Sequence, residues 1–340
     1  MGQVAQLKGR FNFGIETTSG TAVTTAKGYP VARAMLKREP QWAWWEGPGS
    51  FDREHGVVLG HDGSYSMEGW LFPQYMGYIL ANAYGGLTEA SGGAGIYVHT
   101  FSGADWASAT DAIQPWTMAF HPKFDATTSG GTRIALGCVG NALTINWPVR
   151  DVTQFSLEGF ARSVSSGASN MTDFLPSNDA HQRAFVFDNW VWQFGFGAST
   201  TDTVLYPKEA SLSINNNFQF YYDMFTGTAQ ATQLVAGKRE VNFSLTFAVD
   251  TSTESTFWRK VLVSNSNGFF SVSATASTTA SSSMTLTTPR VAITNDPWGE
   301  FSGSSDRQEL TIEGVCVEEM PTIVLIDAVV TGSYGRGTGT

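Results

Sequence analysis

Short stretches in which apolar and polar residues alternate recur along the whole chain. Between Val241 and Val249, valine, phenylalanine and leucine fall on every second position, with polar or small residues between them. This period of two is typical of a strand with one buried face. Comparable runs predict further strands at residues 31–45, 96–101, 114–120, 137–147, 152–161, 186–196, 204–216, 284–295 and 308–317. The last of these keeps its alternation only if Gly314 forms a β-bulge.

A short helix is predicted directly after the strand that ends at Asp250. Thr251 and Glu254 have the spacing of a capping box, in which the threonine hydroxyl accepts the N–H of the glutamate and the glutamate side chain reaches back. Apolar residues then follow at helical spacing, and Asn265 and Gly268 end the helix. The sequence therefore predicts a strand, a short amphipathic helix and a return into a strand.

The same strand–helix unit occurs earlier, between Gly63 and Gly86. Tyr65, Met67 and Leu71 alternate with other residues, Pro73 suits the first turn of a helix, and a glycine pair ends the unit. We expect both units to occupy equivalent places in two similar folds.

The distance between the two units indicates a tandem duplication. The second helix begins at Ser252, 179 residues after Pro73, and its closing Gly268 follows Gly86 by 182 residues. A polar, serine-rich stretch separates the copies. The predicted organisation is an N-terminal arm (1–30), a first domain (31–165), a linker (166–184), a second domain (185–319) and a C-terminal extension (320–340). Each domain is expected to be a β-sandwich or half-barrel with open edges that invite pairing with another copy.

Two long loops are predicted at matching places, at residues 46–62 and 217–236. An exposed loop rarely carries many aromatic side chains, so an aromatic run indicates an interface, the alternative being a loop collapsed on itself. The second loop carries such a run, with Phe218, Phe220, Tyr221, Tyr222 and Phe225 as candidate contacts. The apolar sequence IVLIDAVV of the extension is a further candidate contact, and residues 273–283 are predicted to form a hairpin tip or flexible loop.

Composition narrows the classes of function. The chain has 340 residues, of which 42% are hydrophobic, so a sizeable core can form. Its 30 acidic and 20 basic residues give a net charge of −10, without the basic stripe of a nucleic-acid binder. Cys138 and Cys316 are expected to be free thiols. We find no signal peptide and no apolar run of about 18 residues, so no membrane partner is expected.

No motif indicates an enzyme, a cofactor or a metal. His61-Asp62-Gly63 could take part in acid–base chemistry, but Asp-Gly is more often a turn before a strand. The five histidines lack the spacing of a zinc site, and the G-x-S-x-G elbow of many hydrolases is absent. Glu313, Glu318 and Glu319 could pair as catalytic carboxylates, although an acidic surface is the simpler interpretation. The tryptophans at 42, 44 and 45 could form a sugar-stacking platform or pack against the core or a neighbour.

Several stretches resemble the major tail tube proteins of long-tailed bacteriophages. They are GIETTSGTAV in the arm, EGWLFPQYMGYILANAYGG followed by HTF, and GCVGNALTINWPVRDVTQFSLEGFA, and they cover most of residues 10–165. A weaker similarity covers residues 185–318. The resemblance implies a helix-flanked β-sandwich that forms rings stacked into a tube. A typical subunit has one such domain and six copies per ring, so three chains of this tandem form would give a homotrimeric, pseudo-sixfold ring.

The resemblance also implies a role and partners. The protein would be made in the host cytoplasm and become a structural part of the virion, with tail terminator, tape measure and baseplate proteins as partners. DNA would pass through the tube without specific binding. Acidic residues opposite the apolar positions of strands, Glu68, Glu158 and Glu240, are candidates for the lumen surface. The alternative is a β-sandwich carbohydrate-binding or adhesin module of a phage tail or cell surface.

Overall fold

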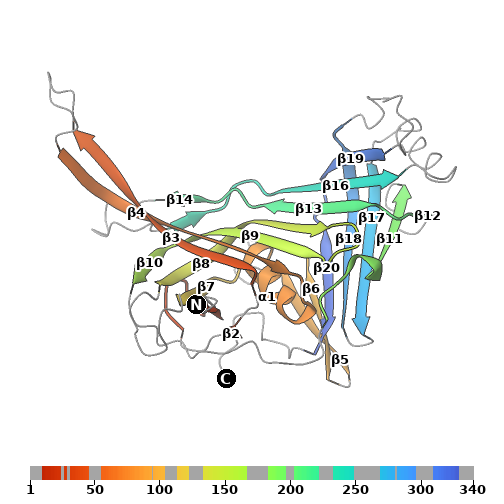
Figure 1. Ribbon diagram of the computed structural model, residues 1–340, viewed down its shortest axis with the longest axis horizontal. Coiled ribbons are helices and arrows are strands. Elements are labelled where there is room, and N and C mark those ends of the chain that lie inside the picture. The colour runs from red at the N-terminus through yellow and green to blue at the C-terminus, as the bar shows by residue number, and fades with distance from the viewer. Residues whose placement is uncertain are drawn as a thin grey trace, which may run out of the picture.

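The chain is built almost entirely from antiparallel strands. The computed structural model describes residues 10–23, 27–28, 31–45, 55–93, 95–103, 113–121, 133–166, 183–196, 203–221, 233–248, 269–279, 282–295 and 309–328. Within these ranges it has one α-helix, α1 (Pro73–Ala83), and one short 3-10 turn, η1 (Phe187–Asn189). The predicted all-β fold with short helices is confirmed (Figure 1).

The first half of the chain forms an antiparallel sheet with the strand order β3-β4-β9-β8-β7-β1. The short strand β10 follows β9 and pairs with the first part of β8, and β5 and β6 form a hairpin after α1. The strands of this half are β1 (Arg10–Ile15), β2 (Lys27–Gly28), β3 (Arg33–Trp45), β4 (His55–Trp70), β5 (Leu87–Gly93), β6 (Ile96–Phe101), β7 (Trp116–His121), β8 (Arg133–Trp147), β9 (Gln154–Ala161) and β10 (Ser163–Ser166).

The second half repeats this order as β13-β16-β19-β18-β17-β11. β20 follows β19 and pairs with the first part of β18, as β10 does with β8. The strands of this half are β11 (Trp190–Phe196), β12 (Thr203–Val204), β13 (Glu209–Asn215), β14 (Gln219–Tyr221), β15 (Gln233–Val235), β16 (Glu240–Ala248), β17 (Phe269–Thr279), β18 (Ser282–Ile293), β19 (Glu309–Cys316) and β20 (Thr322–Asp327). The shared topology supports a tandem duplication, although the predicted second helix lies outside the described residues.

Matching rows of residues strengthen the equivalence of the halves. Leu36, Tyr65 and Gly159 lie opposite one another on β3, β4 and β9. The row Leu212, Phe243 and Gly314 lies in the same place on β13, β16 and β19. Both rows end in a glycine because a Cβ there would lie within 2.5 Å of a packed side chain, at Tyr65 in one half and at Val291 in the other.

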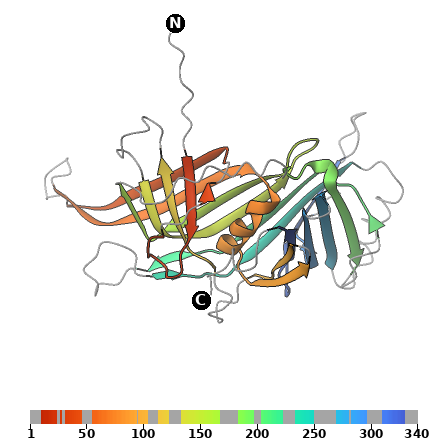
Figure 2. The ribbon, with the colours of Figure 1, turned by 90° about the horizontal axis from the view of Figure 1, so that it is seen from below.

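Among the described strands, two pairings join the halves. β13 pairs with the second part of β8, placing Leu212 opposite Ile145, and β20 pairs with β6, placing Leu325 opposite His99. In Figures 1 and 2, α1 lies between the strands of the first half and strands β18 and β20 of the second. It contacts strands of both halves, and ten of its eleven residues are buried. Pro73 begins the helix, and Gly85 and Gly86, both at positive φ, follow its end as the sequence predicts.

The core is continuous through both halves, and strand alternation places its side chains. Phe243 and Leu245, two of the apolar positions predicted between Val241 and Val249, lie on β16 and are 2% and 1% exposed. At the joint, the ring of Trp147 packs edge-on against Trp190 and Trp192, with ring centres 5.3 and 5.4 Å apart. Because these rings come from β8 and β11, they form one hydrophobic unit from both halves.

The segment rich in serine, threonine and alanine is a strand pair rather than a loop. β17 continues to Thr279 and β18 begins at Ser282, so a flexible loop over residues 273–283 is wrong, whereas the two strands do pair as a hairpin; residues 280–281 lie outside the described residues. Ala274 and Ala276 are buried opposite Leu286 and Met284, while threonine occupies outward positions between them. The alternation of buried and exposed positions could not be recognised in the sequence, because the buried positions are occupied by alanine, which is only weakly hydrophobic.

The predicted bulge at Gly314 is also absent. β19 pairs with β16 without a register shift, and the buried positions are Leu310, Ile312, Gly314 and Cys316. The glycine itself occupies a core position because the neighbouring Val291 side chain leaves no room for a Cβ.

Four predicted irregular segments contain strands. The loop predicted at residues 217–236 contains β14 and β15, which pair with each other. β4 begins at His55, so its hairpin with β3 takes up the end of the loop predicted at residues 46–62. The predicted arm contains β1, which pairs along its whole length with β7 and buries Phe11 and Phe13. The apolar part of the C-terminal extension forms β20 inside the chain, between β18 and β6, so it is not a free contact for assembly.

Candidate functional site

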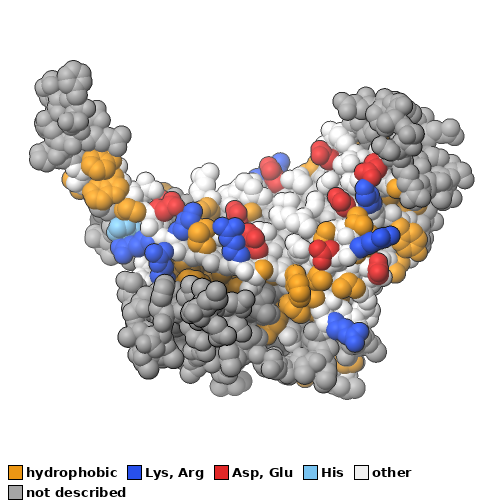
Figure 3. All heavy atoms as spheres, viewed as in Figure 1, with side chains coloured by type: hydrophobic (Ala, Val, Ile, Leu, Met, Phe, Trp, Pro, Cys, Tyr) orange, Lys and Arg blue, Asp and Glu red, His pale blue; other side chains and the backbone are white. Residues whose placement is uncertain are grey.

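A single sheet runs through both halves and presents one polar face. Its seven strands lie in the order β3-β4-β9-β8-β13-β16-β19, with every neighbouring pair antiparallel. Successive side chains of a strand point to opposite faces, and here one face is buried in the core. The opposite face, which we call the polar face, carries mainly serine, threonine, asparagine, glutamine and glutamate. Figure 3 shows charged and other polar side chains along the hollowed upper margin of the molecule.

Acidic side chains outnumber basic ones on the polar face. Lys208, next to the start of β13, forms an ion pair with one of these carboxylates, Glu309, which raises the pKa of the lysine. The basic residues of the face are Arg33 and Lys37, and the acidic ones are Glu39, Glu68, Glu158, Glu209, Glu240, Glu309 and Glu313, all exposed, with the half-buried Asp62 opposite Glu39.

The three glutamates predicted from alternation lie on this one face. Glu68 is on β4, Glu158 on β9 and Glu240 on β16, so they come from both halves of the chain. All three are exposed. The structure thus places them on a common surface, and their place in a tube lumen stays a prediction.

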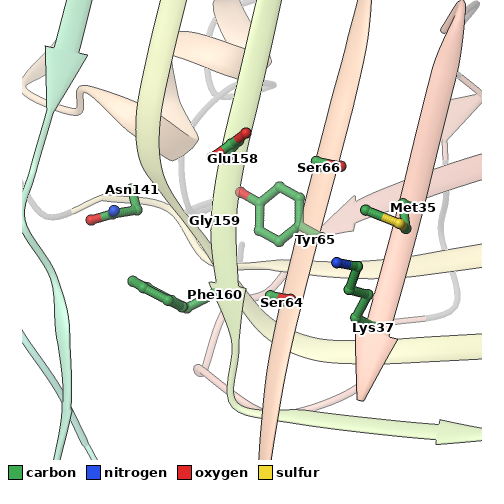
Figure 4. A pocket seen from close by; sticks show the side chains of 9 residues that line it. All are labelled: Met35, Lys37, Ser64, Tyr65, Ser66, Asn141, Glu158, Gly159 and Phe160. Carbon is green, nitrogen blue, oxygen red and sulfur yellow. The ribbon is translucent and has the colours of Figure 1, made fainter. Parts of the chain in front are cut away.

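A shallow hollow of about 220 Å³ interrupts the polar face over β3, β4, β8 and β9 (Figure 4). Beneath it, the Tyr65 hydroxyl donates a hydrogen bond to Asn82 Oδ1 at 2.6 Å, and burial raises the pKa of this tyrosine. The polar side chains of its lining are Lys37, Ser64, Ser66, Asn141 and Glu158. This lining includes neither histidine nor cysteine, and its one carboxylate is that of Glu158.

Buried polar groups fasten the second half to the end of α1. The Asn216 amide donates to the carbonyl oxygens of Ala83 at 2.7 Å and Gly140 at 2.9 Å, and its oxygen accepts from Arg239 Nε at 2.7 Å. The Arg239 guanidinium also lies 5.0 Å from the centre of the Tyr84 ring. Burial lowers the pKa of Arg239, and a cation beside the carbonyl end of a helix is favourable. These contacts connect the second half to the first beside the pairing of β13 with β8.

The β3–β4 hairpin projects from the body (Figure 1). It carries exposed tryptophans. The rings of Trp42 and Trp44 stack with centres 5.3 Å apart and an interplanar angle of 18°, and each side chain is 47% exposed. Trp44 lies across Gly56, where a Cβ would be 2.6 Å from its ring. Each of the two side chains thus keeps about half of its surface exposed.

The predicted aromatic contact patch is only partly free. Phe218 is 7% exposed and packs with Ile113, and its N–H bonds to Asn141 Oδ1 at 2.8 Å. Phe218 is therefore part of the interior of the chain, and the prediction that it forms a contact between rings is wrong. Tyr221 is 56% exposed and stays a candidate. The side chain of Phe220, and Tyr222 and Phe225 altogether, lie outside the described residues.

The remaining chemical candidates have structural roles. His61, Asp62 and Gly63 lie inside β4, so the predicted turn is wrong, and Asp62 accepts a hydrogen bond from Gln41. Glu318, at a positive φ, pairs with Arg290 on the surface. Among the described residues, no cluster of histidine, cysteine and carboxylate side chains could hold a metal, and no helix is long and apolar enough to span a membrane.

Both cysteines are free and buried, as the sequence predicts. Burial raises the pKa of the Cys316 thiol to about 12 and also raises that of Cys138. Because the thiolate is the reactive form, we expect neither thiol to react with a disulfide reagent at neutral pH until the protein unfolds. Timed labelling with and without denaturant measures this, and rapid native labelling of one thiol would contradict it.

Asn216 and Arg239 could not be recognised as contact residues from the sequence. Asn216 stands in the run Asn215-Asn216-Asn217, a composition typical of a loop, and Arg239 follows Gly237 and Lys238. Only the pairing of β13 with β8 brings them to the end of α1, and no local pattern encodes that pairing.

No model of a known protein family matches this chain, and no curated protein matches its sequence.

Proposed function

We propose that this chain is the subunit of a phage-type tail tube, a structural virion protein that forms rings stacked into a conduit for DNA. The observation that carries the proposal is the joint between the halves. Two copies of one topology are linked through an edge strand, β13 on β8, into a continuous sheet with one polar face. Continued by further copies, such a joint gives a closed wall with a polar, net acidic surface on one side.

Three chains would supply six such units for one ring. β3 has the place in the first half that β13 has in the second half. In a ring, the edge of β3 would therefore pair with a neighbouring chain, as β13 pairs with β8 within one chain. Stacking would use the projecting β3–β4 hairpin and Tyr221. Terminator, tape measure and baseplate proteins are the partners that a tube subunit requires at its ends and inside it.

Negative-stain electron microscopy of concentrated protein tests the proposal. We expect rings or tubes in which class averages show six similar units and mass measurement of a single ring gives three chains. Protein that stays monomeric at all concentrations and salt conditions, with no rings, would argue against a tube subunit.

The acidic polar face is expected to line the lumen and to repel DNA. Phosphate affinity comes from lysine and arginine contacts and weakens with salt, so an acidic wall lets a duplex slide. Reversing Glu68, Glu158 and Glu240 to lysine should make assembled tubes retain double-stranded DNA in a gel shift at low salt, while wild-type tubes retain none.

A matched control separates position from net charge. Reversal of Asp151, Asp188 and Glu319, exposed acidic residues outside the polar face, changes the net charge equally. These tubes should not retain DNA. Equal retention by both triple variants would show that the three glutamates do not face the lumen.

A carbohydrate-binding or adhesin module is the second candidate, and the stacked, half-exposed Trp42 and Trp44 favour it. Aromatic faces of this kind suit the apolar face of a sugar ring. Binding of the wild-type protein to a glycan array, lost in the double alanine variant of these tryptophans, would favour this function. If the variant instead loses ring stacking and the wild type binds no glycan, the tube is favoured.

A further inference from the structure

A buried histidine lies between two carboxylates where the last strand meets the first half of the chain. His99 is on β6, Glu89 on β5 and Asp327 on β20. The Nδ1 atom of His99 is 2.9 Å from Glu89 Oε1, and its Nε2 atom is 3.3 Å from Asp327 Oδ1. The side chains of His99 and Asp327 are fully buried, and that of Glu89 is 17% exposed.

The geometry matches the charged form of the histidine. An imidazolium has two N–H donors, whereas a neutral imidazole has one donor and one lone pair. The neutral ring would therefore direct a lone pair at one of the two carboxylate oxygens. A buried carboxylate such as Asp327 is also costly unless a cation or donors compensate its charge.

Tyrosine and apolar side chains are among the groups around this cluster. From α1, Tyr78 lies within electrostatic range of Asp327 and Glu89, and on β18 the buried Met284 and Leu286 lie opposite Leu325 and Ile323 of β20. Burial, followed by the charges of Asp327, Tyr75 and Glu89, raises the pKa of Tyr78, so this phenol stays neutral over the physiological range. With a charged histidine the cluster has a net charge of −1, and with a neutral one it has −2.

We propose that His99 is a pH-dependent clamp that holds β20 on the β5–β6 hairpin. When the ring is charged, it bridges one carboxylate from each side of the β6–β20 pairing. When it is neutral, the bridge is lost and the two carboxylates repel each other. The stabilisation is therefore present at low pH and is lost as the pH rises through the titration of the ring in the folded protein.

The clamp controls one of the two sheet connections between the halves. Opening of β20 frees its pairings with β6 and β18, whereas β13 stays paired with β8. This inference concerns the single chain and does not depend on the proposed tube.

Hydrogen exchange of the full chain between about pH 5 and about pH 9, corrected for the intrinsic rate, tests the clamp, because this range brackets ordinary histidine titration. We expect the protection of the β20 amides to fall roughly tenfold or more across the range. The fall should follow the titration of the His99 ring, read from its NMR resonances. Protection of β13, which is outside the clamp, should change much less.

Variants separate the clamp from a general effect of pH. His99→Gln, which has no titratable ring, should weaken β20 protection at low pH and abolish its pH dependence. His61→Gln, a control in β4, should keep the wild-type profile. Glu89→Gln, at the partly exposed side, retains the buried Asp327 pair and should reduce the pH dependence, which provides a readout if His99→Gln does not fold.

Three results would overturn the proposal. The first is β20 protection that stays constant while the His99 ring titrates. The second is a ring that keeps one protonation state over the whole range. The third is an unchanged pH dependence in His99→Gln or, if that variant does not fold, in Glu89→Gln.

Discussion

Replacement of Trp147 by alanine is expected to lower the free energy of unfolding by about 4 kcal/mol, within the range of about 3–5 for truncating a buried tryptophan. The side chain is fully buried between Trp190 and Trp192, in a cluster that includes residues of both halves. Its strand, β8, pairs with β9 and β13 at once, so the walls of the new cavity cannot move together freely. Urea unfolding followed by circular dichroism measures the loss.

Two controls test the cause of this loss. The Trp147 indole N–H has no hydrogen-bond partner within the described residues, so Trp147→Phe removes volume without breaking a bond and should cost clearly less than alanine. Trp70→Ala, at a side chain that is 52% exposed, should change stability by about 0.5 kcal/mol or less. A loss at Trp147→Ala no greater than at Trp70→Ala would contradict the continuous core across the two halves.

Local alternation predicted which side of each strand is buried. A period of two fixes the face of every side chain once one apolar residue is placed in the core. For this reason Glu68, Glu158 and Glu240 could be assigned to the face opposite the core without knowing the strand order. The same rule failed at Gly314 and at Ala274, because small residues at core positions do not register as hydrophobic.

Contacts between distant strands could not be predicted from the sequence. The aromatic run that begins at Phe218 indicated a buried surface, but hydrophobicity does not say whether the partner is the same chain or another copy. In the structure, Phe218 packs on Ile113, about a hundred residues away. The pairing of β20 with β6 is likewise non-local, so its apolar sequence looked like a free patch. The His99 cluster and the Asn216–Arg239 contacts depend on such pairings.

The second prediction with a large effect concerns the edge of β3 that does not pair with β4. β3 and β13 have the same place in their halves, and the row that contains Leu36 matches the row that contains Leu212. The second edge of β13 pairs with six residues of β8, whereas no strand of the described residues pairs with the second edge of β3. By this equivalence, Arg38 has the place of Ile214, and the β3 edge is expected to pair with the next chain of a ring.

Arg38→Pro should abolish rings and tubes while the monomer stays folded. The Leu36 carbonyl oxygen accepts from Arg133 Nη1 at 2.8 Å, so the backbone groups of even-numbered residues here point away from β4, and the natural Pro40 has the same parity. A proline at 38 therefore removes an outward N–H, and an edge group left unpaired in a joint costs about 1–3 kcal/mol at every interface.

Arg38→Thr, which removes the charge but keeps the N–H, should still assemble. Circular dichroism checks the fold and negative-stain microscopy the assembly; normal tubes from Arg38→Pro, or equal loss in both variants, would show that this backbone edge does not join the chains.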